Sequence, residues 1–88
     1  MAIVKLFGGL RDHVEAKQMT VPGKSVREVL ARLCDGNDEL TRAIFEGEGL
    51  QPHVRVMIAG RDIELDQGLD TPLAESDQLA VFPPIAGG

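Results

Sequence analysis

The 88-residue sequence has no tryptophan and no tyrosine, and it contains only three phenylalanines, two histidines and one cysteine. A single cysteine excludes a disulfide within the chain and a metal site built from several cysteines. The histidines, His13 and His53, stand far apart without ligand-like spacing around them, so we predict no metal site. Three phenylalanines are too few for an aromatic platform on which nucleic-acid bases stack.

Long apolar runs and an excess of positive charge are also missing. No run approaches the roughly 20 apolar residues of a membrane-spanning helix, and the N-terminus lacks the features of a signal peptide. The formal net charge of -5 argues against nucleic acid, whose binders present basic surfaces. We therefore expect a cytoplasmic protein that binds neither a membrane nor nucleic acid.

Patterns for catalysis by the chain itself are absent as well. No nucleophile is arranged recognisably with a base, and Gly8-Gly9 lacks the wider glycine pattern of a nucleotide-binding loop. We expect a protein that is not an enzyme on its own and that binds no cofactor.

Apolar periodicity predicts the extended elements of the fold. Period-two alternation and β-type composition predict strands over residues 2–7, 16–21, 54–59, 63–65 and 78–82. Gly60-Arg61 suits a two-residue turn between the third and fourth strands. Residues 71–74 read as one helical turn, and residues 46–49 read as a flexible polar loop.

One amphipathic helix is predicted to begin at Ser25. Ser25 and Glu28 have the spacing of a capping box, in which each side chain satisfies a free backbone N–H at the helix start. Cys34 continues the apolar stripe of this helix, so we expect its thiol to be buried. A second, shorter helix is expected to end at Phe45. The stripe itself comprises Val26, Val29, Leu30 and Leu33.

The predicted order is two strands, a main helix, a short helix, two strands, a turn and a last strand. One apolar face of a sheet packed on the apolar stripe of one main helix buries both, which gives an α+β fold. We expect residues 1–88 to form a single domain. The last strand is expected inside the sheet, where it anchors the C-terminal residues.

A tail over residues 83–88 comes after the last strand, and its reactive group is the terminal α-carboxylate of Gly88. The two glycines are thin and conformationally permissive, so the carboxylate can enter a narrow channel on another protein. The two prolines favour an extended exit from the fold. The ending reads Phe82, Pro83, Pro84, Ile85, Ala86, Gly87 and Gly88.

This element order and ending resemble the ubiquitin-like β-grasp sulfur carriers of the MoaD/ThiS family, over essentially the whole chain. The ending matches the Phe-Pro-Pro-aliphatic-small-Gly-Gly pattern typical of the small subunit of molybdopterin synthase. Segments 60–63 and 69–73 also look like family segments, whereas Ala59 stands where many relatives have asparagine. The resemblance implies a mixed sheet of about five strands on one main helix, with a flexible C-terminal Gly-Gly tail.

The resemblance also implies a function. Gly88 is adenylated by an E1-like, MoeB-like enzyme that uses ATP, and a sulfur donor protein then converts it to a thiocarboxylate. The segment from Phe82 to Gly87 threads into a pocket of a MoaE-like large subunit. There the sulfur passes to a pterin precursor of the molybdenum cofactor. The catalytic pocket belongs to the large subunit.

Three apolar side chains, Phe7, Met57 and Phe82, fall on strand faces opposite the predicted core. Exposed together they form an apolar patch suited to docking both partners; the alternative is that loops of the chain cover them. Other functions stay open. The chain is alternatively a sulfur carrier for thiamin, cysteine or transfer-RNA thiolation, a ubiquitin-like modifier joined to lysines, or a binding module with an inert tail.

Overall fold

The computed structural model of the chain describes residues 1–16 and 18–83. The strands of its main sheet, in spatial order, are β2 (Gln18–Val21), β1 (Ala2–Leu6), β7 (Gln78–Phe82), β5 (Arg55–Ile58) and β6 (Arg61–Asp62). A separate hairpin consists of β3 (Phe45–Glu46) and β4 (Gly49–Leu50). The α-helices are α1 (Val26–Cys34) and α2 (Asp38–Ile44), and the 3-10 helices are η1 (Gly8–His13), η2 (Ile63–Leu65) and η3 (Gly68–Asp70).

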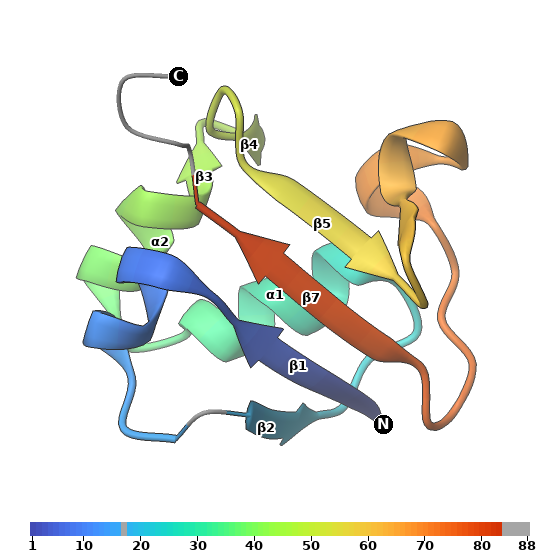
Figure 1. Ribbon diagram of the computed structural model, residues 1–88, viewed down its shortest axis with the longest axis horizontal. Coiled ribbons are helices and arrows are strands. Elements are labelled where there is room, and N and C mark those ends of the chain that lie inside the picture. Colours follow the sequence, from blue (N-terminus) through green and yellow to red (C-terminus); the bar gives the residue numbers. More distant parts are fainter. Residues whose placement is uncertain (17, 84–88) are drawn as a thin grey trace.

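The main sheet is mixed, and the last strand lies in its middle. β1 runs antiparallel to β2 and parallel to β7, which in turn runs antiparallel to β5. Figure 1 shows β7 between β1 and β5, with α1 behind them. The predicted five-stranded sheet and the predicted place of the last strand inside it are both confirmed.

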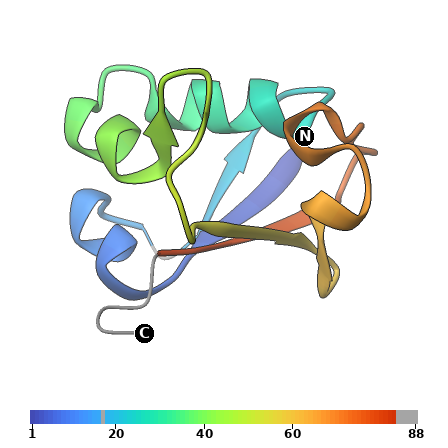
Figure 2. The ribbon, with the colours of Figure 1, turned by 90° about the horizontal axis from the view of Figure 1, so that it is seen from above.

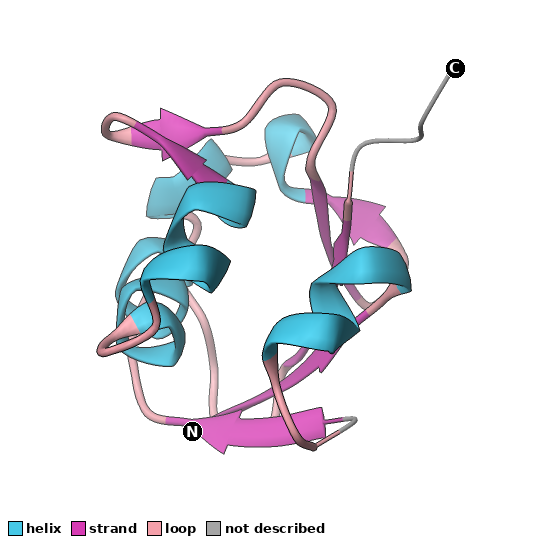
Figure 3. Cartoon of the chain, turned by 90° about the vertical axis from the view of Figure 1, so that its left-hand side faces the viewer, coloured by secondary structure: helices cyan, strands magenta, loops and turns pink. Residues whose placement is uncertain are grey.

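Both α-helices lie on one side of this sheet, as Figure 2 shows from above. Figure 3 shows the same two layers from the side, with the sheet opposite the α-helices. Of the elements described, none crosses the other face of the sheet, which we call the open face. In the described part of the chain, no helix has the length and apolar character needed to span a bilayer.

The core fills the space between the sheet and the α-helices. Alternate strand side chains point inward and are fully buried, among them Val4, Leu6, Val56, Leu79 and Val81. The helices meet them with Val26, Val29, Leu30, Leu40 and Ile44. Cys34 is also buried, as the helical stripe predicted.

The start of α1 confirms half of the predicted capping box. The Ser25 hydroxyl accepts a hydrogen bond from the Glu28 backbone N–H at 3.2 Å. The Glu28 carboxylate lies 3.2 Å from the guanidinium of Arg32, one turn further along the helix. The glutamate therefore forms an ion pair along the helix, while the serine caps its start.

The hairpin turn between β5 and β6 contains Ala59 and Gly60, not Gly60-Arg61. Ile58 pairs directly with Arg61, so two residues are left in the loop. Ala59 and Gly60 have φ values of 51° and 82°, as a primed hairpin turn with two positive φ angles requires. The prediction was wrong by one residue because it placed the glycine first in the loop.

Residues 63–65 form η2 instead of the predicted strand. The Asp62 carboxylate accepts a hydrogen bond from the Glu64 backbone N–H at 2.9 Å, which caps a turn and takes the chain out of the sheet. The helical turn predicted at 71–74 lies earlier, in η3. The Thr71 hydroxyl donates to the Gly68 carbonyl at 2.7 Å and closes that turn from its C-terminal end.

The segment predicted as a flexible loop forms part of a hairpin, and the stretch after β1 forms a 3-10 helix. Residues 46–49 form the tight turn of the β3–β4 hairpin, in which Glu46 pairs with Gly49. The stretch after β1 forms η1, and its Leu10 side chain is buried in the core. The hydrogen bond from the Asn37 side chain to the His13 carbonyl, at 2.8 Å, ties the end of η1 to α2.

Candidate functional site

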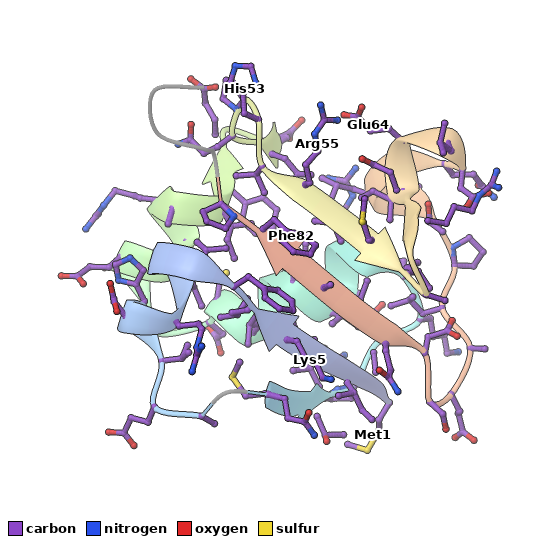
Figure 4. The ribbon with its side chains drawn as sticks, in the orientation of Figure 1. Met1, Lys5, His53, Arg55, Glu64 and Phe82 are labelled. Carbon is purple, nitrogen blue, oxygen red and sulfur yellow. The ribbon has the colours of Figure 1, made fainter. Side chains whose placement is uncertain are left out.

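The candidate site is the point where the chain leaves β7. Leu79 and Val81 point into the core, so Ala80 and Phe82 point to the open face. Figure 4 shows Phe82 on the near side of the sheet, on its middle strand. Because β7 is hydrogen-bonded on both sides, the last residues before the tail are held by β1 and β5 together.

Phe82 is half-buried and stacks on Phe7. Their ring centroids are 4.6 Å apart and the ring planes differ by 12°. The Phe7 backbone N–H also donates to the Val81 carbonyl at 3.0 Å, which extends the β1–β7 pairing by one residue. An aromatic pair of this kind adds about 0.5–1.5 kcal/mol beyond its burial, so the start of the tail is held by the residue that follows β1.

Pro83 lies against Gly8, the residue after Phe7. A Cβ atom built on Gly8 would lie 2.7 Å from Pro83 Cγ and 3.3 Å from Pro83 Cδ. Gly8 has a φ of +59°, in the left-handed region that favours glycine. A residue from the start of the chain thus supports the first proline of the tail.

Met57 lies on the open face one row further along the sheet. It pairs with Ala80, and Ala80 pairs with Lys5 on the other side. Phe7 is 38% exposed, whereas Met57 and Phe82 are half-buried. The structure therefore places the three predicted docking residues on one face, with Phe7 and Phe82 in contact.

Charged side chains surround this apolar group. Lys5 is exposed in the same row as Met57, and Arg55 pairs in register with Phe82. One guanidinium nitrogen of Arg55 lies 3.5 Å from a carboxylate oxygen of Asp62 and 3.5 Å from one of Glu64. Figure 4 shows Arg55 and Glu64 next to each other at the edge of the open face. Sequence reasoning missed Lys5, Arg55 and Gly8. Only the strand register shows that Arg55 lies beside Phe82 and Lys5 in the row of Met57, and only the folded structure shows that Gly8 contacts Pro83.

The other ionisable candidates lie elsewhere. Burial raises the pKa of the Cys34 thiol, and a hydrogen bond with Thr41 opposes that shift in part. His13 Nδ1 lies 3.4 Å from a Glu39 carboxylate oxygen, on the side of the molecule where η1 meets α2. Within residues 1–16 and 18–83, no three His, Cys, Asp or Glu side chains gather as a metal-binding group.

Most of the predicted tail lies outside the described residues. These positions are Pro84, Ile85, Ala86, Gly87 and Gly88. Their role in reaching a partner stays a prediction, and so does the chemistry of the Gly88 carboxylate. The structure describes the root of the tail, formed by Phe82 and Pro83.

Comparisons with known proteins agree with this fold. The family model described as the ThiS family matches residues 4–88. Small archaeal modifier protein 3 of Haloferax volcanii is 38% identical over an alignment of 88 positions. The alignment covers 97% of this chain and 96% of that protein.

Solved structures are similar over the whole length. The solution structure of small archaeal modifier protein 1 from Methanosarcina acetivorans has a TM-score of 0.89 and 32% identity, covering 99% of this chain and 95% of that one. A chain in the crystal structure of the Amycolatopsis orientalis BexX/CysO complex has a TM-score of 0.89 and 22% identity, with both chains covered completely. This second likeness shows the fold alone, a ubiquitin-like β-grasp.

Proposed function

This chain belongs to the ThiS family of ubiquitin-like sulfur carriers and modifiers, and from that premise we propose that its working group is the α-carboxylate of Gly88. The observation that carries the proposal is the family match itself, which runs through the tail to residue 88. The root of the tail on the middle strand supports the proposal. Because that root is firmly held, a partner that binds the folded domain also positions the start of the tail that carries the carboxylate.

The chemistry begins with activation of that carboxylate. A carboxylate is ionised at neutral pH and is a poor electrophile, because its oxygen is a poor leaving group. An E1-like enzyme joins the Gly88 carboxylate to the α-phosphate of ATP and releases pyrophosphate, which leaves an acyl adenylate. The outer sulfur of a persulfide on the donor protein then attacks the Gly88 carbonyl carbon and AMP departs, which leaves an acyl disulfide between the two proteins. A second thiol of the donor attacks the donor's own sulfur in that bond, so a disulfide forms on the donor and Gly88 leaves as the thiocarboxylate.

We assign the thiocarboxylate to sulfur transfer in molybdopterin formation. The ending from Phe82 to Gly88 has the form typical of the small subunit of molybdopterin synthase. In this role a MoaE-like large subunit receives the tail and supplies the pterin-binding pocket and the acid–base groups. The chain itself contributes the sulfur atom and its delivery.

A second candidate is covalent attachment to other proteins. The observation in its favour is the 38% identity to a protein named as a small archaeal modifier. The same adenylate serves both uses: a lysine amine attacks the Gly88 carbonyl carbon, AMP departs, and an isopeptide bond forms. Sulfur carriage for other pathways shares the thiocarboxylate and differs only in the acceptor.

The test is ATP-dependent activation of the purified chain by the E1-like enzyme of the same organism, followed as pyrophosphate release. We expect release with the wild-type chain and none when one alanine is added after Gly88, because the added residue displaces the carboxylate. Equal release from both chains, or none from either with an enzyme shown to be active, would refute the proposal.

The acceptor is identified in a second step. Pterin conversion by the thiocarboxylate form, together with the large subunit, would assign molybdopterin formation. Gly88 in isopeptide linkage to lysines of cell proteins would assign protein modification instead.

A further inference from the structure

We propose that Gly8 is a positioning residue that sets the direction in which the tail leaves the sheet. This inference rests on the proposed function, because direction matters only if the tail must enter a partner. Gly8 does not contact the reacting atoms, and its effect passes through the Pro83 ring.

Gly8 and Pro83 are in close contact. The Cβ of any other residue at position 8 would stand 2.7 Å from Pro83 Cγ, closer than the 3.0 Å that real Cβ contacts respect. The left-handed φ of +59° adds a second restriction. Glycine at this position therefore satisfies both the turn into η1 and the space that the proline ring occupies.

Two consecutive tail-root residues are held by two consecutive residues of the N-terminal segment. Phe82 stacks on Phe7 at 4.6 Å, and Pro83 lies on Gly8. The proline ring fixes its own φ near −65°. The stacked rings and the contact with Gly8 therefore restrict the position of Pro83 itself.

A reaction is sensitive to the placement of its reacting groups. Pro83 is the last described residue before the rest of the tail, so a shift of its ring away from Gly8 shifts the point from which the tail starts. An error of about 1 Å in the placement of a reacting group already costs on the order of 10²-fold in rate.

The chain offers a matched control for backbone strain. Gly68 has a φ of +61°, and a Cβ there meets nothing within 4 Å. Gly68→Ala and Gly8→Ala thus introduce the same strained conformation, but only the change at Gly8 also pushes against the tail. Gly9→Ala is a second control, one residue further along, again with nothing within 4 Å of the added Cβ.

The experiment measures kcat and KM for ATP-dependent activation by the E1-like enzyme, with the chain as the varied substrate. For Gly8→Ala we expect kcat to fall by about ten- to a hundredfold, with KM changed by less than about threefold because the docking face is kept. Gly68→Ala and Gly9→Ala should keep both values. Circular dichroism establishes that each variant is folded under the assay conditions.

A double-mutant cycle tests whether the effect passes through the proline ring. Pro83→Ala removes Cγ and Cδ, so Gly8→Ala should lower kcat much less in the Pro83→Ala chain than in the wild type. If Gly8→Ala does not fold, Pro83→Ala alone is expected to lower kcat with KM kept, because the root is then no longer seated.

The outcomes separate the two proposals. A wild-type chain that is never activated would remove the proposed function and this inference together. A wild-type chain that is activated, with Gly8→Ala as fast as Gly68→Ala, would remove the inference alone. If Gly8→Ala lowered kcat by the same factor with and without the Pro83 ring, the inference would also be overturned.

Discussion

Cys34 shows how the environment of one residue changes its chemistry. Its side chain is buried at the end of α1, and burial raises the pKa of the thiol, partly opposed by the Thr41 hydroxyl. Because the thiolate is the reactive form, burial and the raised pKa both disfavour reaction at this sulfur. In the proposed function, the sulfur that moves is bound to Gly88, and Cys34 belongs to the core.

The raised pKa predicts a pH dependence of stability. The unfolded chain releases the Cys34 proton at a lower pH than the folded chain does. The contribution of this group is therefore fully present below about pH 9, its ordinary pKa, and is lost as the pH rises through the folded value. Urea unfolding should show that the free energy of unfolding falls more between pH 7.5 and pH 10 for the wild type than for Cys34→Ala. Equal losses would contradict a raised pKa.

Ala59 supplies a prediction at the hairpin turn. Its φ of 51° lies in the left-handed region, where asparagine is tolerated better than alanine. We expect Ala59→Asn to raise the free energy of unfolding by up to about 1 kcal/mol, measured by urea denaturation. Ala74→Asn, at an exposed position without a positive φ, is the matched control and should have little effect. A destabilised Ala59→Asn variant would show that the turn differs from the one described.

At the scale of elements, the start of α1 depends on one side chain. Removing the Ser25 hydroxyl leaves the Glu28 N–H without its acceptor, and such caps contribute about 1 kcal/mol. Ser25→Ala should therefore lower the free energy of unfolding by about that amount. Glu28→Gln should cost less, because the glutamate forms an exposed ion pair with Arg32 and such pairs contribute little. A larger loss for Glu28→Gln than for Ser25→Ala would contradict the half-formed box.

The open face of the sheet carries the predicted docking residues. We expect Met57→Asp to weaken binding to the E1-like enzyme by at least about tenfold, equal to about 1.4 kcal/mol, because it places a charge in an apolar contact. Thr20→Asp adds the same charge to the open face at the far edge of the sheet, because Thr20 lies on the edge strand β2, where it pairs with Ile3 of β1. This variant should bind like the wild type. Isothermal titration calorimetry compares them. Equal affinity of all three chains would exclude Met57 from the interface.

The elements that the sequence predicts best are those whose periodicity extends over several residues. Alternation along residues 78–82 identified β7 and its inward face, and the stripe from Val26 identified α1. Short segments were placed less well, because one side-chain hydrogen bond decides them. Asp62 caps η2 and Thr71 closes η3, and neither interaction leaves a periodic pattern.

At the scale of the whole molecule, the root of the tail joins the two ends of the chain. Phe7 and Gly8 follow the first strand, and Phe82 and Pro83 stand at the end of the last. The sequence alone predicted that Phe7 and Phe82 would share a face, because that depends on strand alternation. The stacking of their rings and the seat of Pro83 on Gly8 could not be predicted, because they depend on which strands are neighbours and in which register.

The most direct test of the central claim is intact-mass spectrometry of the chain after incubation with ATP, the E1-like enzyme and a sulfur donor protein. We predict a mass increase equal to the difference between one sulfur atom and one oxygen atom, localised to Gly88 by fragmentation. An unchanged mass, with an enzyme and donor that thiolate another carrier in the same assay, would contradict the claim.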